Sequence, residues 1–173
     1  MVLSPTASAF TQGCELVAQM AGPAYEVDNQ KVASLIPPEK MPATIKINYL
    51  VRSGAWFIYQ TDPSWFTKET CAPLNKAHRS STFEFAPVIK NRKQGQYAVV
   101  TSSFMVKTYN KLDINKIAQR YGFKLLTELP SGGSAIFEVG SQVSYDRMLE
   151  TLDRDKDIRY AAPVLSEKRY QLR

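Results

Sequence analysis

Histidine and cysteine are scarce in this sequence, which excludes most metal-based and nucleophile-based chemistry. Of 173 residues only His78 is a histidine, and only Cys14 and Cys71 are cysteines. A Ser-His-Asp triad would need a positioned nucleophile and an orienting carboxylate, but His78 lies in a polar segment, residues 76–81, without such a pattern. HExxH, CxxC, P-loop and GxGxxG motifs are missing too. We therefore expect a protein that is not an enzyme, with no catalytic residues, no metal and no cofactor.

Long apolar runs and concentrated charge are missing as well. No run approaches the 18 apolar residues of a transmembrane helix, so we expect no membrane association. The net charge is +6, with 10 basic and 7 acidic residues in 1–95 and 12 basic and 9 acidic residues in 96–173. Nucleic-acid binders usually concentrate basic residues on one face, so we expect no nucleic-acid partner. A basic cluster within residues 111–124 is interpreted as a solvated helix face.

Between residues 96 and 164 the chain shows a closely spaced series of elements. β-Branched and aromatic residues predict strands, and two apolar stripes at helical spacing predict helices after caps at Asp113 and Ser144. The expected order is strand 98–109, helix 114–121, strand 123–129, strand 134–139, helix 145–152 and strand 158–161. Two helices on one face of a four-stranded antiparallel sheet predict a ferredoxin-like βαββαβ domain.

Residues 1–95 are less regular and predict a smaller N-terminal region of mixed helix and β-hairpin. The expected elements are a helix within 10–20, a hairpin of strands 44–51 and 55–60, and an extended stretch at 81–89. A dense aromatic group is interpreted as a small core, with a partner-facing patch as the alternative. Its members are Trp56, Phe57, Tyr59, Trp65 and Phe66. The predicted class is α+β, divided into 1–95, 96–164 and a C-terminal tail, 165–173.

The two cysteines have no nearby metal-ligand partner. In an exported protein such a pair predicts one disulfide between Cys14 and Cys71, whereas in a cytosolic protein both would be buried thiols. Residues 1–3 lack the charged and apolar regions of a signal peptide. We favour the disulfide, and with it a periplasmic or secreted protein from which a signal peptide has been removed.

The amino-acid sequence of the C-terminal segments resembles that of one protein family. The stretches IAQRYGFKLLTELPSGGSAIFEV (117–139) and YDRMLETLDRDKDIRYAAPV (145–164) resemble the propeptide domain of subtilisin-like serine proteases. The family pattern ends in D-x-x-I/V-x-Y-A-x-P. Here its residues are Asp155, Ile158, Tyr160, Ala161 and Pro163. The resemblance covers roughly residues 99–164, and it is the order and spacing of common pieces that make it specific.

A propeptide-like domain without its protease looks like an external chaperone, most similar to that of a secreted, Aeromonas-type, kexin-like serine protease. The resemblance implies a heterodimer with a subtilisin/kexin-like protease. The chain would assist folding of the protease and inhibit it by placing the tail in the active-site cleft. The implied tail residues are Leu165, Ser166, Glu167, Lys168, Arg169, Tyr170, Gln171, Leu172 and Arg173. The alternative is a stand-alone ferredoxin-like binding or regulatory module with no protease partner.

One departure from the family pattern concerns acidic residues. Many members carry acids just after the last strand, where the resemblance implies that they cap helices of the protease. Here residues 161–164 contain no acid, and the first one is Glu167. Either apolar contact or another carboxylate would then replace the cap, and Glu128 and Glu138 are the possible helix-capping carboxylates.

Overall fold

The computed structural model describes residues 12–67 and 69–168. In this part of the chain three α-helices and two short 3-10 helices connect nine strands. The elements are α1 (Glu15–Ala21), β1 (Tyr25–Ser34), η1 (Pro38–Lys40), β2 (Asn48–Ser53), β3 (Trp56–Gln60), β4 (Leu74–His78), β5 (Ser81–Asn91), β6 (Gln96–Thr108), η2 (Lys111–Asp113), α2 (Ile114–Tyr121), β7 (Lys124–Glu128), β8 (Ser134–Glu138), α3 (Tyr145–Asp153) and β9 (Ile158–Glu167).

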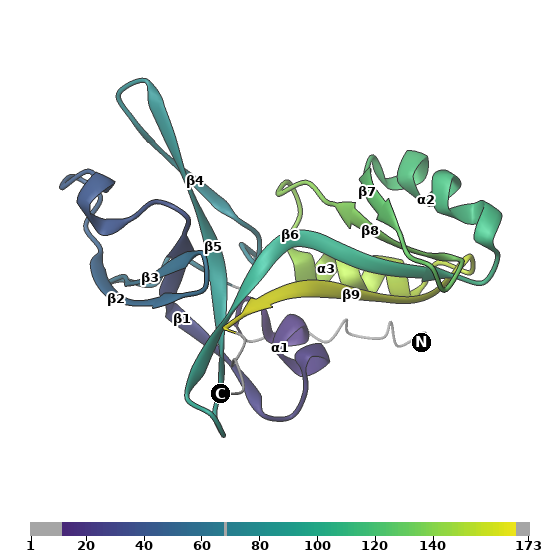
Figure 1. The fold of residues 1–173 in the computed structure, drawn as a ribbon, viewed down its shortest axis with the longest axis horizontal. Helices are drawn as coiled ribbons and strands as arrows, with labels where there is room; N and C mark the ends of the chain where they lie inside the picture. The colour runs from purple at the N-terminus through teal and green to yellow at the C-terminus, as the bar shows by residue number, and fades with distance from the viewer. Residues whose placement is uncertain (1–11, 68, 169–173) are drawn as a thin grey trace, which may run out of the picture.

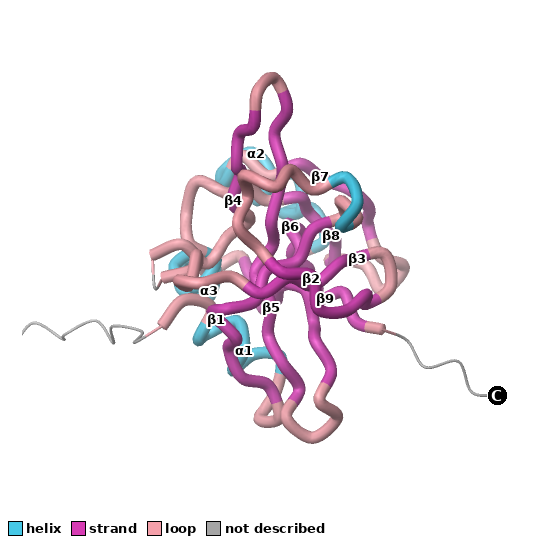
Figure 2. Tube along the Cα trace, turned by 90° about the vertical axis from the view of Figure 1, so that its left-hand side faces the viewer, coloured by secondary structure: helices cyan, strands magenta, loops and turns pink. Residues whose placement is uncertain are grey.

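All nine strands belong to one antiparallel sheet. Its order is β2-β3-β1-β5-β6-β8-β7, with β4 paired to β5 and β9 paired to β6. The hairpin of the long strands β5 and β6 lies at the centre, and Figure 1 shows the two halves of the molecule diverging from it. Viewed from the end in Figure 2, strands of both halves pass through the same middle region. One sheet therefore connects the two ends of the molecule.

The helices cover one side of the C-terminal half of this sheet. In Figure 1, α3 lies behind β6, β8 and β9, and buried side chains of α2 and α3 share one apolar core with those of the strands. The largest fully buried side chains of this core are Phe104, Phe137, Tyr145, Ile89, Ile114, Ile117 and Leu152. Two smaller clusters lie in the N-terminal half. No helix of residues 12–67 or 69–168 lies over the opposite side of β6, β7, β8 and β9.

The predicted fold class, a ferredoxin-like domain beside a smaller N-terminal region, is wrong. The structure has a single nine-stranded sheet instead of a compact βαββαβ unit with a separate neighbour. β6 causes the difference, because residues 96–99 pair with β5 while residues 103–107 pair with β8. The predicted boundary between 95 and 96 falls in the turn of the β5–β6 hairpin, and the division into domains stays a prediction.

Individual elements were predicted better than their arrangement. The helix expected at 114–121 is α2, and Gly122 ends it in the left-handed region at φ 66°. In the N-terminal half β1 and β4 were not predicted, and the helix begins only at Glu15.

The aromatic group of the N-terminal half is a core, as expected. Tyr59 and Phe66 are buried, and Phe57 and Trp65 pack against them. Trp56 packs against a second small cluster. The alternative, a partner-facing aromatic patch, does not fit these positions.

Candidate functional site

The described residues contain no group of three or more His, Cys, Asp or Glu side chains that could hold a metal ion. His78 lies at the end of β4, where its Nδ1 is 2.9 Å from the Thr44 hydroxyl. Three members of the basic cluster are ion-paired: Lys116 with Asp113, Arg120 with Asp155 and Asp157, and Lys124 with Glu138. That cluster is a charged surface in which most charges are already compensated.

The uncovered side of β6, β7, β8 and β9 carries apolar side chains. Side chains alternate across a strand, so the burial of Phe104 and Phe137 under the helices places Met105 and Ile136 on the opposite side. Met105 is flanked by Ile136 of β8 and by Ala162 of β9. Neither Met105 nor Ile136 belongs to a core cluster of the described residues.

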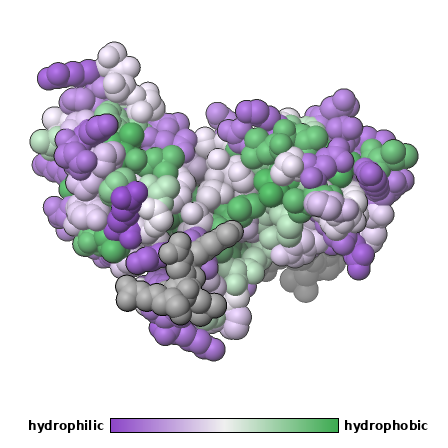
Figure 3. All heavy atoms as spheres, viewed as in Figure 1, coloured by the Kyte–Doolittle hydropathy of each residue, from purple (hydrophilic) through white to green (hydrophobic). Residues whose placement is uncertain are grey.

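Two large side chains extend this surface to the neighbouring strands. Tyr160 of β9 is 46% exposed, and Leu126, next to a register shift in β7, is 47% exposed. We name this surface the open face, and its apolar members are Met105, Leu126, Ile136, Tyr160 and Ala162. Figure 3 shows apolar side chains gathered over this half of the molecule, bordered by hydrophilic ones. Contiguous exposed apolar surface of this kind marks interaction sites.

The two predicted helix-capping carboxylates lie at opposite ends of the β7–β8 hairpin. Glu138 pairs across the strands with Lys124, its carboxylate 3.2 Å from the lysine Nζ. Glu128 lies near the turn, paired in register with Ala135, and forms no ion pair with a described residue. Glu128 has no described partner to be displaced, but its register partner Ala135 is buried under the helices. Glu138, two residues from Ile136 on β8, is therefore the carboxylate on the open face.

The predicted tail begins inside the sheet. Leu165, Ser166 and Glu167 belong to β9 and pair with residues 98–100 of β6. Lys168 is exposed and lines a hollow of about 310 Å³ with Val51 and Tyr97. The remaining predicted tail residues, Arg169, Tyr170, Gln171, Leu172 and Arg173, lie outside the described residues.

A tyrosine holds the end of β9 in place. The Tyr25 hydroxyl, on β1, donates a hydrogen bond to the Glu167 carboxylate. This bond, followed by burial, raises the pKa of Tyr25, so the hydroxyl stays a donor at neutral pH. Because the partners are 142 residues apart, this contact joins the first strand to the last.

We expect Tyr25→Phe to loosen the end of β9 with little effect on global stability. A hydrogen bond to a charged group contributes about 1.5–3 kcal/mol at most, and solvent exposure reduces that contribution here. Amide hydrogen exchange of residues 165–167 should become faster, while exchange in α2 stays unchanged. Tyr97→Phe is the matched control, since its hydroxyl donates no hydrogen bond to a described residue. Equal exchange in the two variants would contradict the anchoring role.

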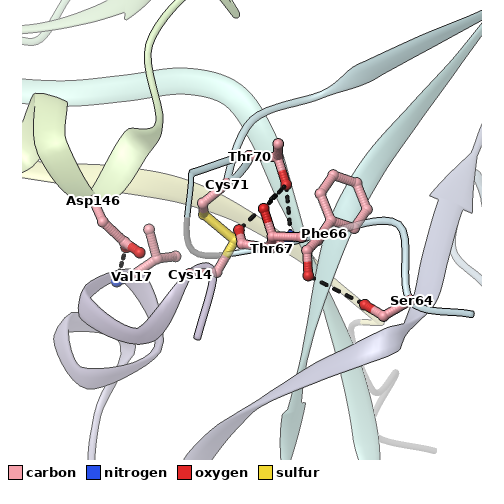
Figure 4. Close-up of a disulfide and its surroundings, with 8 residues drawn as sticks. All are labelled: Cys14, Val17, Ser64, Phe66, Thr67, Thr70, Cys71 and Asp146. Carbon is pink, nitrogen blue, oxygen red and sulfur yellow. Dashed lines mark hydrogen bonds between the residues drawn. A yellow bond between two sulfur atoms is a disulfide. The ribbon is translucent and has the colours of Figure 1, made fainter. Parts of the chain in front are cut away.

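A second long-range contact surrounds the disulfide. Cys14 and Cys71 are bonded, as predicted, and Figure 4 shows Asp146 of α3 beside the start of α1. Cys14 caps α1 without a side-chain hydrogen bond, and Asp146 Oδ1 instead accepts one from Val17 N at 3.1 Å. The backbone N–H of Tyr145, the residue before Asp146, donates a hydrogen bond to Cys71 O at 2.6 Å. The disulfide and both helix starts therefore form one connected group.

Burial dominates the titration of Asp146. The side chain is fully buried, and its Oδ2 has no hydrogen-bond partner among the described residues. Burial raises the pKa of Asp146 to about 6, against the opposing effect of the N–H groups of Val17 and of residues 14–16. A buried acid with a raised pKa makes stability depend on pH.

Neither Tyr25 nor Asp146 was predicted. Asp146 follows the expected cap at Ser144 and looks like an ordinary acidic residue in the first turn of a helix. Tyr25 lies in a strand that was not predicted. The sequence contains no local signal for either contact, because the partner residues are more than 100 positions away.

Comparisons with known proteins assign no family. No protein-family model matches the chain, and no curated protein or solved structure matches it either. In the described part, no helix is long and apolar enough to cross a membrane. The evidence for function therefore comes from the open face, the end of β9 and the disulfide, which is typical of proteins in oxidising compartments.

Proposed function

We propose that this protein is an external chaperone and inhibitor of a secreted subtilisin/kexin-like serine protease. The observation that carries the proposal is an uncovered apolar sheet face next to a strand, β9, that runs on into a basic C-terminal segment. The sequence resemblance of residues 99–164 to protease propeptides supports the choice of partner. The proposal does not depend on a separate ferredoxin-like domain.

The open face supports binding to a broad, flat partner surface. Tyr160 and Leu126 are the exposed large side chains on it, and aromatic side chains are frequent anchors of interfaces. By the resemblance, the partner surface consists of two parallel helices of the protease. Glu138 lies two residues from Ile136 on β8 and therefore on the same side of the sheet. It would cap one of those helices favourably after leaving its ion pair with Lys124.

The strand β9 supports inhibition through the tail. Its last residues are held by β6 and by Tyr25, so the chain leaves the sheet from a fixed point at Lys168. The segment that follows, 169–173, begins and ends with arginine. A protease with a preference for basic residues would take such a segment into its cleft as an added strand with pocketed side chains.

One interface would serve both activities. A protein that binds the native protease and not its unfolded chain shifts the folding equilibrium toward the native state. If the same docking also directs the tail into the cleft, the folded protease stays blocked. The disulfide supports an oxidising compartment, and we propose a periplasmic or secreted location.

The test is refolding of a denatured subtilisin/kexin-like protease with and without this protein. We expect recovered activity only when the protein is present during refolding and is later removed. Deleting residues 169–173 should weaken inhibition strongly and leave the chaperone folded. The double variant Leu126→Ser with Tyr160→Ser should weaken inhibition by about tenfold for each side chain, as expected for anchors that contribute about 1.4 kcal/mol each.

Two exposed leucines outside the open face provide the matched control. Leu35 is 56% exposed and Leu112 is 76% exposed, so Leu35→Ser with Leu112→Ser removes similar apolar surface without touching the open face. Full inhibition by the truncated chain would rule out the tail mechanism. Lack of any effect on such proteases would instead favour a stand-alone binding module.

A further inference from the structure

A groove lies at the free edge of β9, on the side of the sheet that the helices cover, and it meets the open face at Tyr160. It has a volume of about 490 Å³ and is bounded by α1, α3 and β9. We name it the edge groove, and its lining residues used below are Leu16, Met20, Leu149, Glu150, Asp153 and Arg159. Leu149 is buried at the floor, whereas Met20 is 36% exposed at the rim. The groove is therefore an apolar depression open to solvent.

The edge of β9 beside the groove is free to pair. β9 pairs with β6 only, among the described residues. Pro163 lacks an N–H donor and protects the outer edge at its own position. Residues 158–162 remain, with Ile158 and Ala161 lining the groove. An extended segment of about five residues would fit along this stretch and place alternate side chains in the groove.

The charged residues at the rim of the groove indicate which charge a bound segment should carry. Glu150 and Asp153 of α3 form no ion pair with a described residue, unlike Asp155 and Asp157 nearby, which are both paired with Arg120. On a protein with a net charge of +6, this is a locally acidic lip. Arg159 lies on the β9 side of the groove, so that side carries a positive charge opposite the acidic lip.

We propose that the edge groove binds an extended segment of a partner protein in which an apolar residue has a basic residue two positions away on each side, so that all three side chains lie on one face. The backbone of the segment would add a strand to β9, its apolar side chain would enter between Met20 and Leu149, and its basic side chains would meet Glu150 and Asp153. The edge groove borders the open face at Tyr160, and the proposal does not require a protease partner.

Fluorescence anisotropy with short labelled peptides tests the proposal on the full chain. The probe is the N-acetylated hexapeptide Lys-Ser-Leu-Ser-Lys-Ser, in which the two lysines and the leucine share one face of the strand. We expect saturable binding that is at least tenfold weaker when glutamate replaces lysine, and also when N-methyl leucine prevents strand pairing. If the lysine peptide does not saturate, or if N-methylation leaves its affinity unchanged, the strand-addition proposal is overturned.

Matched variants separate the groove from overall charge. Glu150→Gln with Asp153→Asn should weaken binding of the lysine peptide by at least tenfold. Glu39→Gln with Glu84→Gln removes the same total charge from exposed sites elsewhere and should leave the affinity within about twofold. Equal losses in the two double variants would show that only net charge attracts the peptide, and the proposed site would then be wrong.

Discussion

Replacing Cys14 and Cys71 with alanine is expected to lower the free energy of unfolding by about 4 kcal/mol. The disulfide closes a loop of 57 residues, and the loss of closure entropy in the unfolded chain accounts for a stabilisation of this size. The effect is large because both half-cystines are fully buried and contact the start of α3 through Tyr145 and Asp146. Urea denaturation monitored by tryptophan fluorescence measures the change.

Reduction of the wild-type protein is the control for this double variant. Reduced wild type and the alanine variant should unfold at similar urea concentrations, since both lack the covalent link. The amide of Ala18 should show the largest increase in hydrogen-exchange rate, because its N–H donates to the O of Cys14 at the start of α1. If the variant is destabilised by less than about 1 kcal/mol, then noncovalent packing of α1 is enough to hold the helix.

We expect Asp146→Asn to remove a pH-dependent part of the stability. Burial raises the pKa of Asp146 to about 6, from about 4 in the unfolded chain. A group with a raised folded-state pKa binds its proton more tightly in the native state. Its contribution is therefore fully present below about pH 4 and is lost as the pH rises through about 6. The loss is at most about 3 kcal/mol.

The difference between wild type and Asp146→Asn isolates this group. Asparagine keeps an acceptor for Val17 N and carries no charge, so the variant should match wild type near pH 4 and be the more stable protein at pH 7. Asp155 acts in the opposite sense: its own burial raises the pKa, but Arg120 and the N–H of Asp157 outweigh it and lower the pKa. Subtraction at each pH cancels that contribution.

Urea unfolding at pH 4, 5, 6 and 7 makes the comparison. If the asparagine variant becomes less stable than wild type as the pH rises, the N–H groups at the start of α1 outweigh burial and the pKa of Asp146 is not raised.

Sequence reasoning succeeded where the signal is local. The stripe through Ile114 and Ile117 repeats within two helical turns, and Gly122 supplies the left-handed residue that ends the helix. The strands at 134–139 and 158–161 were found from alternation and from their β-branched and aromatic content, although β9 continues to Glu167. The spacing of apolar residues within a short segment indicates its secondary structure, because residues one or two turns apart lie on the same face.

The pairing partners of the long strands could not be predicted from the sequence. β6 has 13 residues and changes neighbour along its length, from β5 to β8, while β9 accompanies it on the other edge. The alternation of apolar and polar residues in a strand does not identify its neighbouring strand, because backbone hydrogen bonds can pair any two extended segments. The fold prediction therefore assigned correct elements to a wrong arrangement.

By itself the sequence determined the helices of the C-terminal half, several strands and the pair of cysteines, whose only described partner is each other. Only the tertiary structure decided that the two halves share one sheet, that Asp146 meets the start of α1 and that Tyr25 holds Glu167. The last two contacts join residues more than 100 positions apart. Their stability comes from burial and geometry in the folded chain, which no short stretch of sequence encodes.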